Sequence, residues 1–126
     1  MDLGANVTLT GGVALQTQES WCEFISKDLQ SISFGGNAAE LYFEEDKFDD
    51  FLKKLAAIKG IFYVHPVQQY SWGQRVIRFY DPDFHILEIG ENMKSVCRRF
   101  LDSGMTIEAA AVRMNVPEKF VRACVR

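Results

Sequence analysis

The polar side chains of residues 74–80 are of types that can hold a small molecule. If this β-branched and aromatic segment forms a strand, alternate side chains share a face, so Gln74 and Arg78 lie with Val76 and Tyr80. A guanidinium on such a face can bind a carboxylate or phosphate through charge-assisted hydrogen bonds. The segment therefore predicts a ligand-facing surface on which Arg78 anchors an anionic group and Gln74 adds a second polar contact.

The cysteine and histidine side chains give no clear sign of a metal site or a catalytic group. The chain has three cysteines, an odd number, and no Cys-x-x-Cys pair, which argues against a disulfide framework and against a thiolate zinc site. We expect the cysteines to be reduced and structural. His85 follows Asp-Pro-Asp-Phe in a predicted turn and is expected to be a structural hydrogen-bonding residue, while His65 is expected to lie on the surface.

Length and composition limit the class of protein. The 126 residues are 48% hydrophobic and 25% charged, as in one ordinary globular domain. No apolar run is long enough for a membrane helix, and the N-terminus lacks the pattern of a secretory signal, so we expect a cytoplasmic protein without membrane contact. Residues 1–93 carry a net charge of −7 and residues 94–126 one of +4, which indicates a tail with its own partner or one that docks on the acidic body.

Periodicity predicts the elements that position these side chains. A glycine pair joins two short β-branched runs, which indicates a hairpin, whereas residues 18–37 show no sustained period and are expected to form a loop. From residue 39 onward the order is strand, helix, strand, strand, strand. The predicted strands span residues 6–10, 13–17, 39–43, 61–64, 74–80 and 86–89, with a Pro66-containing loop after the fourth.

The predicted helix of this βαβββ order has an apolar stripe. Its apolar residues recur at intervals of three and four, the opposite face is charged, and Gly60 ends the pattern. We expect the stripe to be core, and it comprises Phe48, Phe51, Leu52, Leu55 and Ile58.

The C-terminal residues predict three short helices, broken at Gly104 and at residues 115–117, and the last two resemble a helix-turn-helix. Thr106 can cap one helix, Asn115 can take a left-handed turn position, and Pro117 suits the first position of the next helix. Ala110 and Ala111 are small enough for the two helices to cross closely, and Val121 and Cys124 fall on the inward face of the last helix. The outward face of that helix carries Glu118, Lys119, Arg122 and Arg126. That face would meet DNA in a regulator. Because its positive charge is small, we favour a packing or oligomerisation role over nucleic-acid binding.

The βαβββ order resembles the glyoxalase/bleomycin-resistance/extradiol-dioxygenase superfamily, whose fold is the vicinal oxygen chelate fold. The residues that carry the resemblance are Trp72-Gly73-Gln74-Arg75 and Phe79-Tyr80-Asp81-Pro82-Asp83-Phe84-His85-Ile86-Leu87-Glu88. It implies an α+β fold in which a βαβββ module forms a half-barrel mixed sheet, with a small C-terminal helical extension. It further implies a glyoxalase-like domain at residues 1–93, with an incomplete first module at 1–37 and a complete module at 38–91, and a helical tail at 94–126.

The resemblance also implies a metal site. The glutamate that ends such a module ligates a divalent metal, and it falls on Glu88, which would also be the catalytic residue. Glu40 occupies the place of a second ligand, usually a histidine, and Gln16 is the nearest match to a third. Such oxygen ligands suit Mg²⁺ or Mn²⁺, whereas Zn²⁺ or Fe²⁺ prefers an imidazole. Trp72 and Tyr42 would supply the walls of a substrate site that Gln74 and Arg78 complete.

A second interpretation of the carboxylates stays open. Glu88 and Glu40 are equally explained as salt-bridge partners of Arg78 or Arg75 in a barrel that holds no metal. Phe84 stands where the family has glycine, so a residue that disfavours positive φ must make this turn.

The resemblance implies binding of a small polar or anionic metabolite, with metal-assisted lyase, isomerase or dioxygenase chemistry. The alternatives are a non-catalytic binding or resistance protein and a metabolite-responsive regulator that contacts DNA through its tail. Because one module leaves sheet edges unpaired, we expect a twofold homodimer formed through residues 5–17 or 39–90.

Overall fold

The computed structural model describes residues 1–125, which form two compact units that meet at Phe34 and Gly35 in the sequence. The first unit contains β1 (Asn6–Thr8), β2 (Ala14–Gln16), α1 (Gln18–Ile25) and a 3₁₀ turn, η1 (Leu29–Ser31). The second contains β3 (Glu40–Glu45), α2 (Phe48–Ala56), β4 (Tyr63–Gln69), β5 (Arg75–Tyr80), β6 (Ile86–Glu91), α3 (Met93–Asp102), α4 (Ile107–Met114) and α5 (Glu118–Cys124). No helix of residues 1–125 is both long and apolar enough to cross a membrane.

The first unit confirms the predicted hairpin and corrects the predicted loop. β1 and β2 pair antiparallel, with shorter strands than expected. The loop prediction for residues 18–37 holds for residues 32–37 and is wrong where α1 and η1 form. α1 begins directly after Thr17, whose side chain accepts a hydrogen bond from the Ser20 amide. Cys22 is the buried residue of α1, whereas Phe24 is 73% exposed. With eight residues, the helix is too short to give a sustained apolar period in the sequence.

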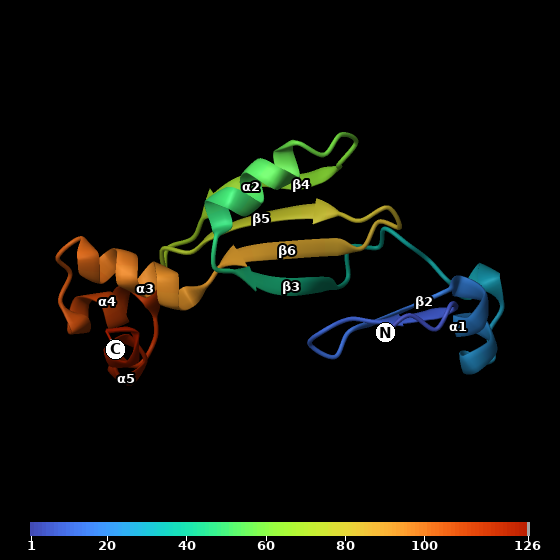
Figure 1. The fold of residues 1–126 in the computed structure, drawn as a ribbon, viewed down its shortest axis with the longest axis horizontal. Helices are drawn as coiled ribbons and strands as arrows, with labels where there is room; N and C mark the ends of the chain where they lie inside the picture. Colours follow the sequence, from blue (N-terminus) through green and yellow to red (C-terminus); the bar gives the residue numbers. More distant parts are fainter. Residues whose placement is uncertain (126) are drawn as a thin grey trace. The chain divides into compact units, whose positions relative to one another are not determined.

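The second unit confirms the βαβββ order and the mixed sheet. The strands lie in the order β3-β6-β5-β4, with β3 parallel to β6 and the other two pairs antiparallel (Figure 1). The predicted loop at Pro66 is wrong, since Pro66 lies inside β4. That strand is at the end of the sheet, where a residue without an N–H is tolerated, and its register with β5 shifts on both sides of His65.

The core of this unit lies between α2 and one face of the sheet. Ile77 and Ile89 are buried there against the apolar stripe of α2, and Phe79 joins them. The predicted stripe is confirmed except at Ile58, which is 58% exposed because α2 ends at Ala56. Arg78 has the opposite strand parity to Ile77, so it lies on the face that α2 does not cover.

The turn before β6 adopts the expected strained conformation. Phe84 has a φ of 62°, in the left-handed region that glycine usually occupies. Asp81 fixes the turn, because its Oδ1 accepts hydrogen bonds from the amides of Asp83 and His85, each at 2.9 Å. His85 Nδ1 lies 2.9 Å from Asp81 Oδ2, which confirms its structural role.

The tail forms the three predicted helices. Thr106 caps α4 by accepting from the Ala109 amide, and Asn115 ends it with a φ of 55°. Pro117 is the N-cap of α5 rather than its first helical residue. The helices enclose a core of their own, and its buried residues are Val96, Cys97, Phe100, Ala110, Ala111, Met114, Val121 and Cys124. Arg126, expected on the outward face, lies outside the described residues.

Candidate functional site

Arg78 is the centre of a cluster on the sheet face that α2 leaves open. Its Nε donates to Glu40 Oε2 at 2.7 Å, and its Nη2 donates to Glu88 Oε2 and, at 3.5 Å, to Glu40 Oε1. Its Nη1 donates to the Tyr70 hydroxyl at 2.6 Å and lies 3.2 Å from His65 Nε2. A guanidinium has five N–H groups. Each of them therefore has an acceptor supplied by the protein.

The two carboxylates of this cluster are in different environments. The Glu88 side chain is 9% exposed and that of Glu40 is 36% exposed. Burial, followed by the contact with Glu40, raises the pKa of Glu88 above its usual value, although the charge of Arg78 opposes the shift. The hydrogen bond from Arg78 lowers the pKa of Glu40. A carboxyl group with a raised pKa beside an ionised one can exchange a proton with a bound molecule.

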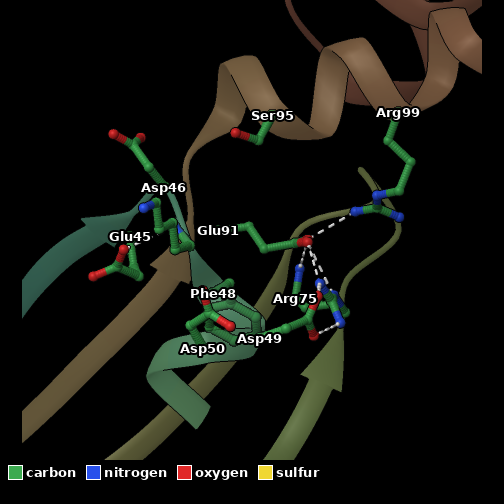
Figure 2. A pocket seen from close by; sticks show the side chains of 10 residues that line it. Glu45, Asp46, Phe48, Asp49, Asp50, Arg75, Glu91, Ser95 and Arg99 are labelled. Carbon is green, nitrogen blue, oxygen red and sulfur yellow. Dashed lines mark hydrogen bonds and ion pairs between the residues drawn. The ribbon is translucent and has the colours of Figure 1, made fainter. Parts of the chain in front are cut away.

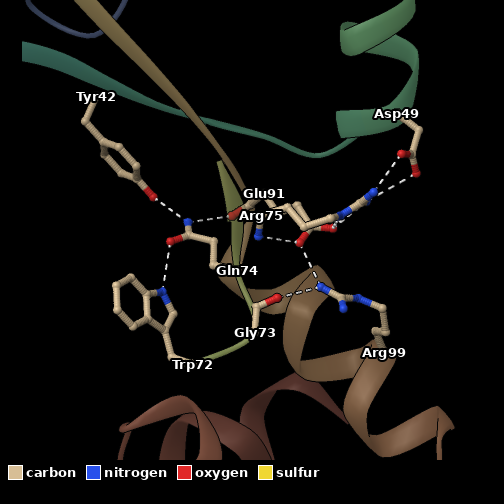
Figure 3. A network of polar contacts seen from close by, with 8 residues as sticks. All are labelled: Tyr42, Asp49, Trp72, Gly73, Gln74, Arg75, Glu91 and Arg99. Carbon is tan, nitrogen blue, oxygen red and sulfur yellow. Dashed lines mark hydrogen bonds and ion pairs between the residues drawn. The ribbon is translucent and has the colours of Figure 1, made fainter. Parts of the chain in front are cut away.

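The other predicted ligand-binding residues form a hydrogen-bonded group on the same face. Gln74 donates through Nε2 to the Tyr42 hydroxyl and to the Glu91 carbonyl, both at 2.9 Å (Figure 3). Trp72 donates its indole N–H to Gln74 Oε1 at 3.1 Å and stacks on Tyr70 with ring centroids 4.5 Å apart. The structure thus brings Gln74, Trp72 and Tyr42 together, with Tyr70 linking them to Arg78.

A charged network that the sequence did not predict lies at the end of β6. Glu91 is buried and accepts from Arg75 Nη2 at 2.7 Å, from the Arg75 amide at 2.9 Å and from Arg99 Nη2 at 2.7 Å. Arg75 also pairs with Asp49 of α2 at 2.9 Å, and Arg99 donates to the Gly73 carbonyl (Figure 3). This network ties α3 and the start of α2 to the sheet.

A pocket of about 490 Å³ lies beside this network (Figure 2). Arg75, with the opposite strand parity to Arg78, lines it, so the pocket is separate from the Arg78 cluster. Acidic side chains outnumber basic ones around it, and Arg75 and Arg99 are already bound by Glu91. The lining residues are Glu45, Asp46, Lys47, Phe48, Asp49, Asp50, Arg75, Glu91, Ser95 and Arg99.

The donor set as placed does not fit a divalent metal. Glu40 and Glu88 are the oxygen ligands expected from the sequence, but the guanidinium of Arg78 binds both of them. Gln16, the expected third ligand, ends β2 in the first unit. Within residues 1–125, no group of three or more His, Cys, Asp and Glu side chains is arranged to hold a metal ion. The sequence left two roles open for Glu40 and Glu88, metal ligands or salt-bridge partners of an arginine. In the structure both carboxylates form ion pairs with Arg78.

Two residues of the cluster were missed from sequence. His65 was expected at the surface but lies opposite Arg78 in the β4–β5 pairing, and its Nδ1 is 2.7 Å from the Pro66 carbonyl. Because Nδ1 faces an acceptor, Nε2 is the lone-pair nitrogen that accepts from Arg78. Tyr70 was not singled out either. The register shifts on both sides of His65 hide it from strand parity, and Tyr70 follows the last residue of β4.

Comparison with known proteins gives the family. Residues 1–94 match the model of the glyoxalase-like domain family. Among curated proteins, none matches the chain significantly. A structure of a protein of unknown function from Agrobacterium tumefaciens str. C58 is 34% identical, with a TM-score of 0.60 over 73% of this chain and 71% of that one.

Two further solved structures are similar. A glyoxalase-related enzyme from Fulvimarina pelagi is 20% identical, with a TM-score of 0.54 over 70% of this chain and 63% of that one. A member of the glyoxalase/bleomycin resistance protein/dioxygenase superfamily from Sphaerobacter thermophilus DSM 20745 is 27% identical, with a TM-score of 0.49 over 69% and 65%. The match thus spans less than two thirds of each of these two chains. The glyoxalase-like resemblance predicted from the sequence is confirmed, and the chain belongs to the glyoxalase-like domain family.

Proposed function

We propose that the chain binds a small polar molecule on the sheet face opposite α2, with Glu88 as the central contact. The observation that carries this proposal is the burial of Glu88 and Gln74, which are 7% and 5% exposed, on a face that contributes nothing to the apolar core under α2. Glu88 is buried with its charge paired to Arg78, and burial raises its pKa. A buried carboxyl group with a perturbed pKa and a specific charge partner is a candidate functional residue. Aromatic side chains beside this centre would supply the apolar contacts that small-molecule sites usually contain.

The hydrogen bonds of Arg78 favour one kind of ligand. Since each of its N–H groups already has a protein acceptor, a ligand meets the carboxylate oxygens of Glu40 and Glu88 more readily than a free guanidinium. With both carboxylates ionised, they would leave one negative charge that Arg78 does not balance. We therefore favour a ligand with hydroxyl or amino groups over the anionic ligand that the sequence suggested. If the site is catalytic, we propose Glu88 as the residue that touches the reacting atoms.

Ligand binding should be lost when Glu88 loses its charge. In a thermal-shift screen of small amines, polyols and hydroxy acids, compounds that bind the wild type should raise its melting temperature by mass action. Glu88→Gln should remove those increments, whereas Asp50→Asn, an exposed change on α2, should leave them intact. Increments that persist in Glu88→Gln would place the binding elsewhere. Turnover of the compounds that bind then separates an enzyme from a non-catalytic binding or resistance protein.

We also propose that the chain forms a homodimer through its sheet. Support comes from β3, a terminal strand of the sheet on which Leu41 and Phe43 are 38% and 40% exposed. Sedimentation equilibrium at micromolar concentration should give a dimer. Leu41→Glu should shift the equilibrium toward the monomer, while Ile58→Glu, at a residue beyond the end of α2, should not. A compact monomer for the wild type contradicts this proposal.

For the tail we propose a packing role in preference to DNA binding. Arg99 and its contacts with Glu91 and Gly73 attach α3 to the sheet. On the outward face of α5, Arg122 pairs with Glu118 at 3.0 Å, which reduces the positive charge that this face would offer to a phosphate backbone.

A further inference from the structure

We propose that Arg78 is a built-in cation that takes the place of a divalent metal ion between Glu40 and Glu88. The three residues come from three neighbouring strands, β5, β3 and β6, and share one face of the sheet. Arg78 stands directly opposite Glu88 in the β5–β6 register, and its guanidinium also reaches Glu40 at 2.7 Å. One side chain therefore spans both carboxylates.

The electrostatics of the pair explain why a cation is needed there. Two carboxylates that face the same point repel each other, and burial of Glu88 strengthens that repulsion. A bound metal can relieve it only when the metal is present. A guanidinium relieves it permanently, because arginine keeps its proton and the planar group can bind two carboxylates at once.

The surroundings hold the guanidinium in this position. Its Nη1 is bound on the far side by the Tyr70 hydroxyl at 2.6 Å and by His65 Nε2 at 3.2 Å. A metal that entered between Glu40 and Glu88 would have to break these bonds as well as both ion pairs. The site is therefore assembled without a metal, and removing Arg78 should leave two unshielded carboxylates that a hard cation can bind.

Manganese binding by the full chain tests this proposal without any organic ligand. Electron paramagnetic resonance of free Mn²⁺ should show no saturable site in the wild type at millimolar metal. Arg78→Met should gain a site with a Kd of about 1 mM or tighter, and Arg78→Met combined with Glu88→Gln should lose it. Arg98→Met removes the same charge from an exposed position in α3 and should behave as the wild type.

Each outcome decides the proposal. A saturable Mn²⁺ site in the wild type that disappears in Glu88→Gln overturns it, and so does a folded Arg78→Met variant that gains no site. If Arg78→Met is unfolded in chelator but folds when Mn²⁺ is added, the proposal stands. If it stays unfolded in both conditions, the wild-type titration alone decides. A result that overturns the proposal about Arg78 would not bear on the proposed ligand binding, because the Mn²⁺ titration uses no organic ligand.

Discussion

Replacing Glu91 with glutamine should destabilise the second unit by roughly 2–4 kcal/mol, because the change leaves two arginines without their shared carboxylate. Glu91 is 5% exposed and bridges Arg75 on β5 to Arg99 on α3. The expected loss is somewhat smaller than for a fully buried pair, since the side chains of Arg75 and Arg99 are 29% and 40% exposed. The same carboxylate holds α3, so the contacts of the tail with the sheet should loosen too.

Urea denaturation followed by tryptophan fluorescence checks this prediction. The chain has one tryptophan in each unit, so a Trp21→Phe background leaves Trp72 to report on the second unit alone. Asp49→Asn is the matched control, because Asp49 pairs with the same Arg75 but its side chain is 70% exposed, and its loss should be below about 1 kcal/mol. Equal effects of the two substitutions would show that Glu91 is no more than a surface partner.

Adding one methyl group at Gly73 should also be severely destabilising. A Cβ at this position would lie 2.6 Å from Cε2 of Phe100 and closer still to its Cζ, and the φ of Gly73 is +88°. Phe100 is 8% exposed within the core of the tail, so its ring cannot move without disturbing that core. Overpacking and backbone strain together predict a loss of about 2–5 kcal/mol for Gly73→Ala.

The two contributions to this loss can be separated. Gly104 has a φ of +95°, and a Cβ added there would meet no atom within 4 Å, so Gly104→Ala should show the backbone contribution alone, about 1–2 kcal/mol. The double variant Gly73→Ala with Phe100→Ala should lose less stability than the sum of its single variants, because the deleted ring no longer clashes. Strict additivity in urea denaturation would mean that the tail does not pack under Gly73.

Local patterns account for the elements that were predicted correctly. The three-and-four spacing of Phe48, Leu52 and Leu55 defines α2. The period-two geometry of the strand predicted over residues 74–80 places Arg78 on the face opposite Ile77. Prediction failed for two elements whose structure depends on their place in the fold rather than on a repeating pattern of residues. α1 has only eight residues, too few for a sustained apolar period, and Pro66 is tolerated because β4 is a terminal strand.

The contacts within the candidate site join residues that are far apart in the sequence, and local patterns do not predict them. Arg78 and Glu40 are 38 positions apart, and they meet only because β6 lies between β3 and β5 in the sheet. The sequence offered Arg78 or Arg75 as the partner of Glu40 and Glu88, and the strand order shows that Arg78 is the partner of both. The contact between Glu91 and Arg99 likewise depends on how α3 leaves the end of β6, which no periodicity in either element describes.

The most direct test of the ligand site is chemical-shift mapping of the ¹⁵N-labelled full chain with the compounds that raise its melting temperature. We expect the largest changes on the amides of Tyr42, Arg78 and Glu88 and on the indole N–H of Trp72, which donates to Gln74 at 3.1 Å. Changes confined to α2, or to Asp46 and Ser95 at the pocket beside Glu91, would contradict the proposed site.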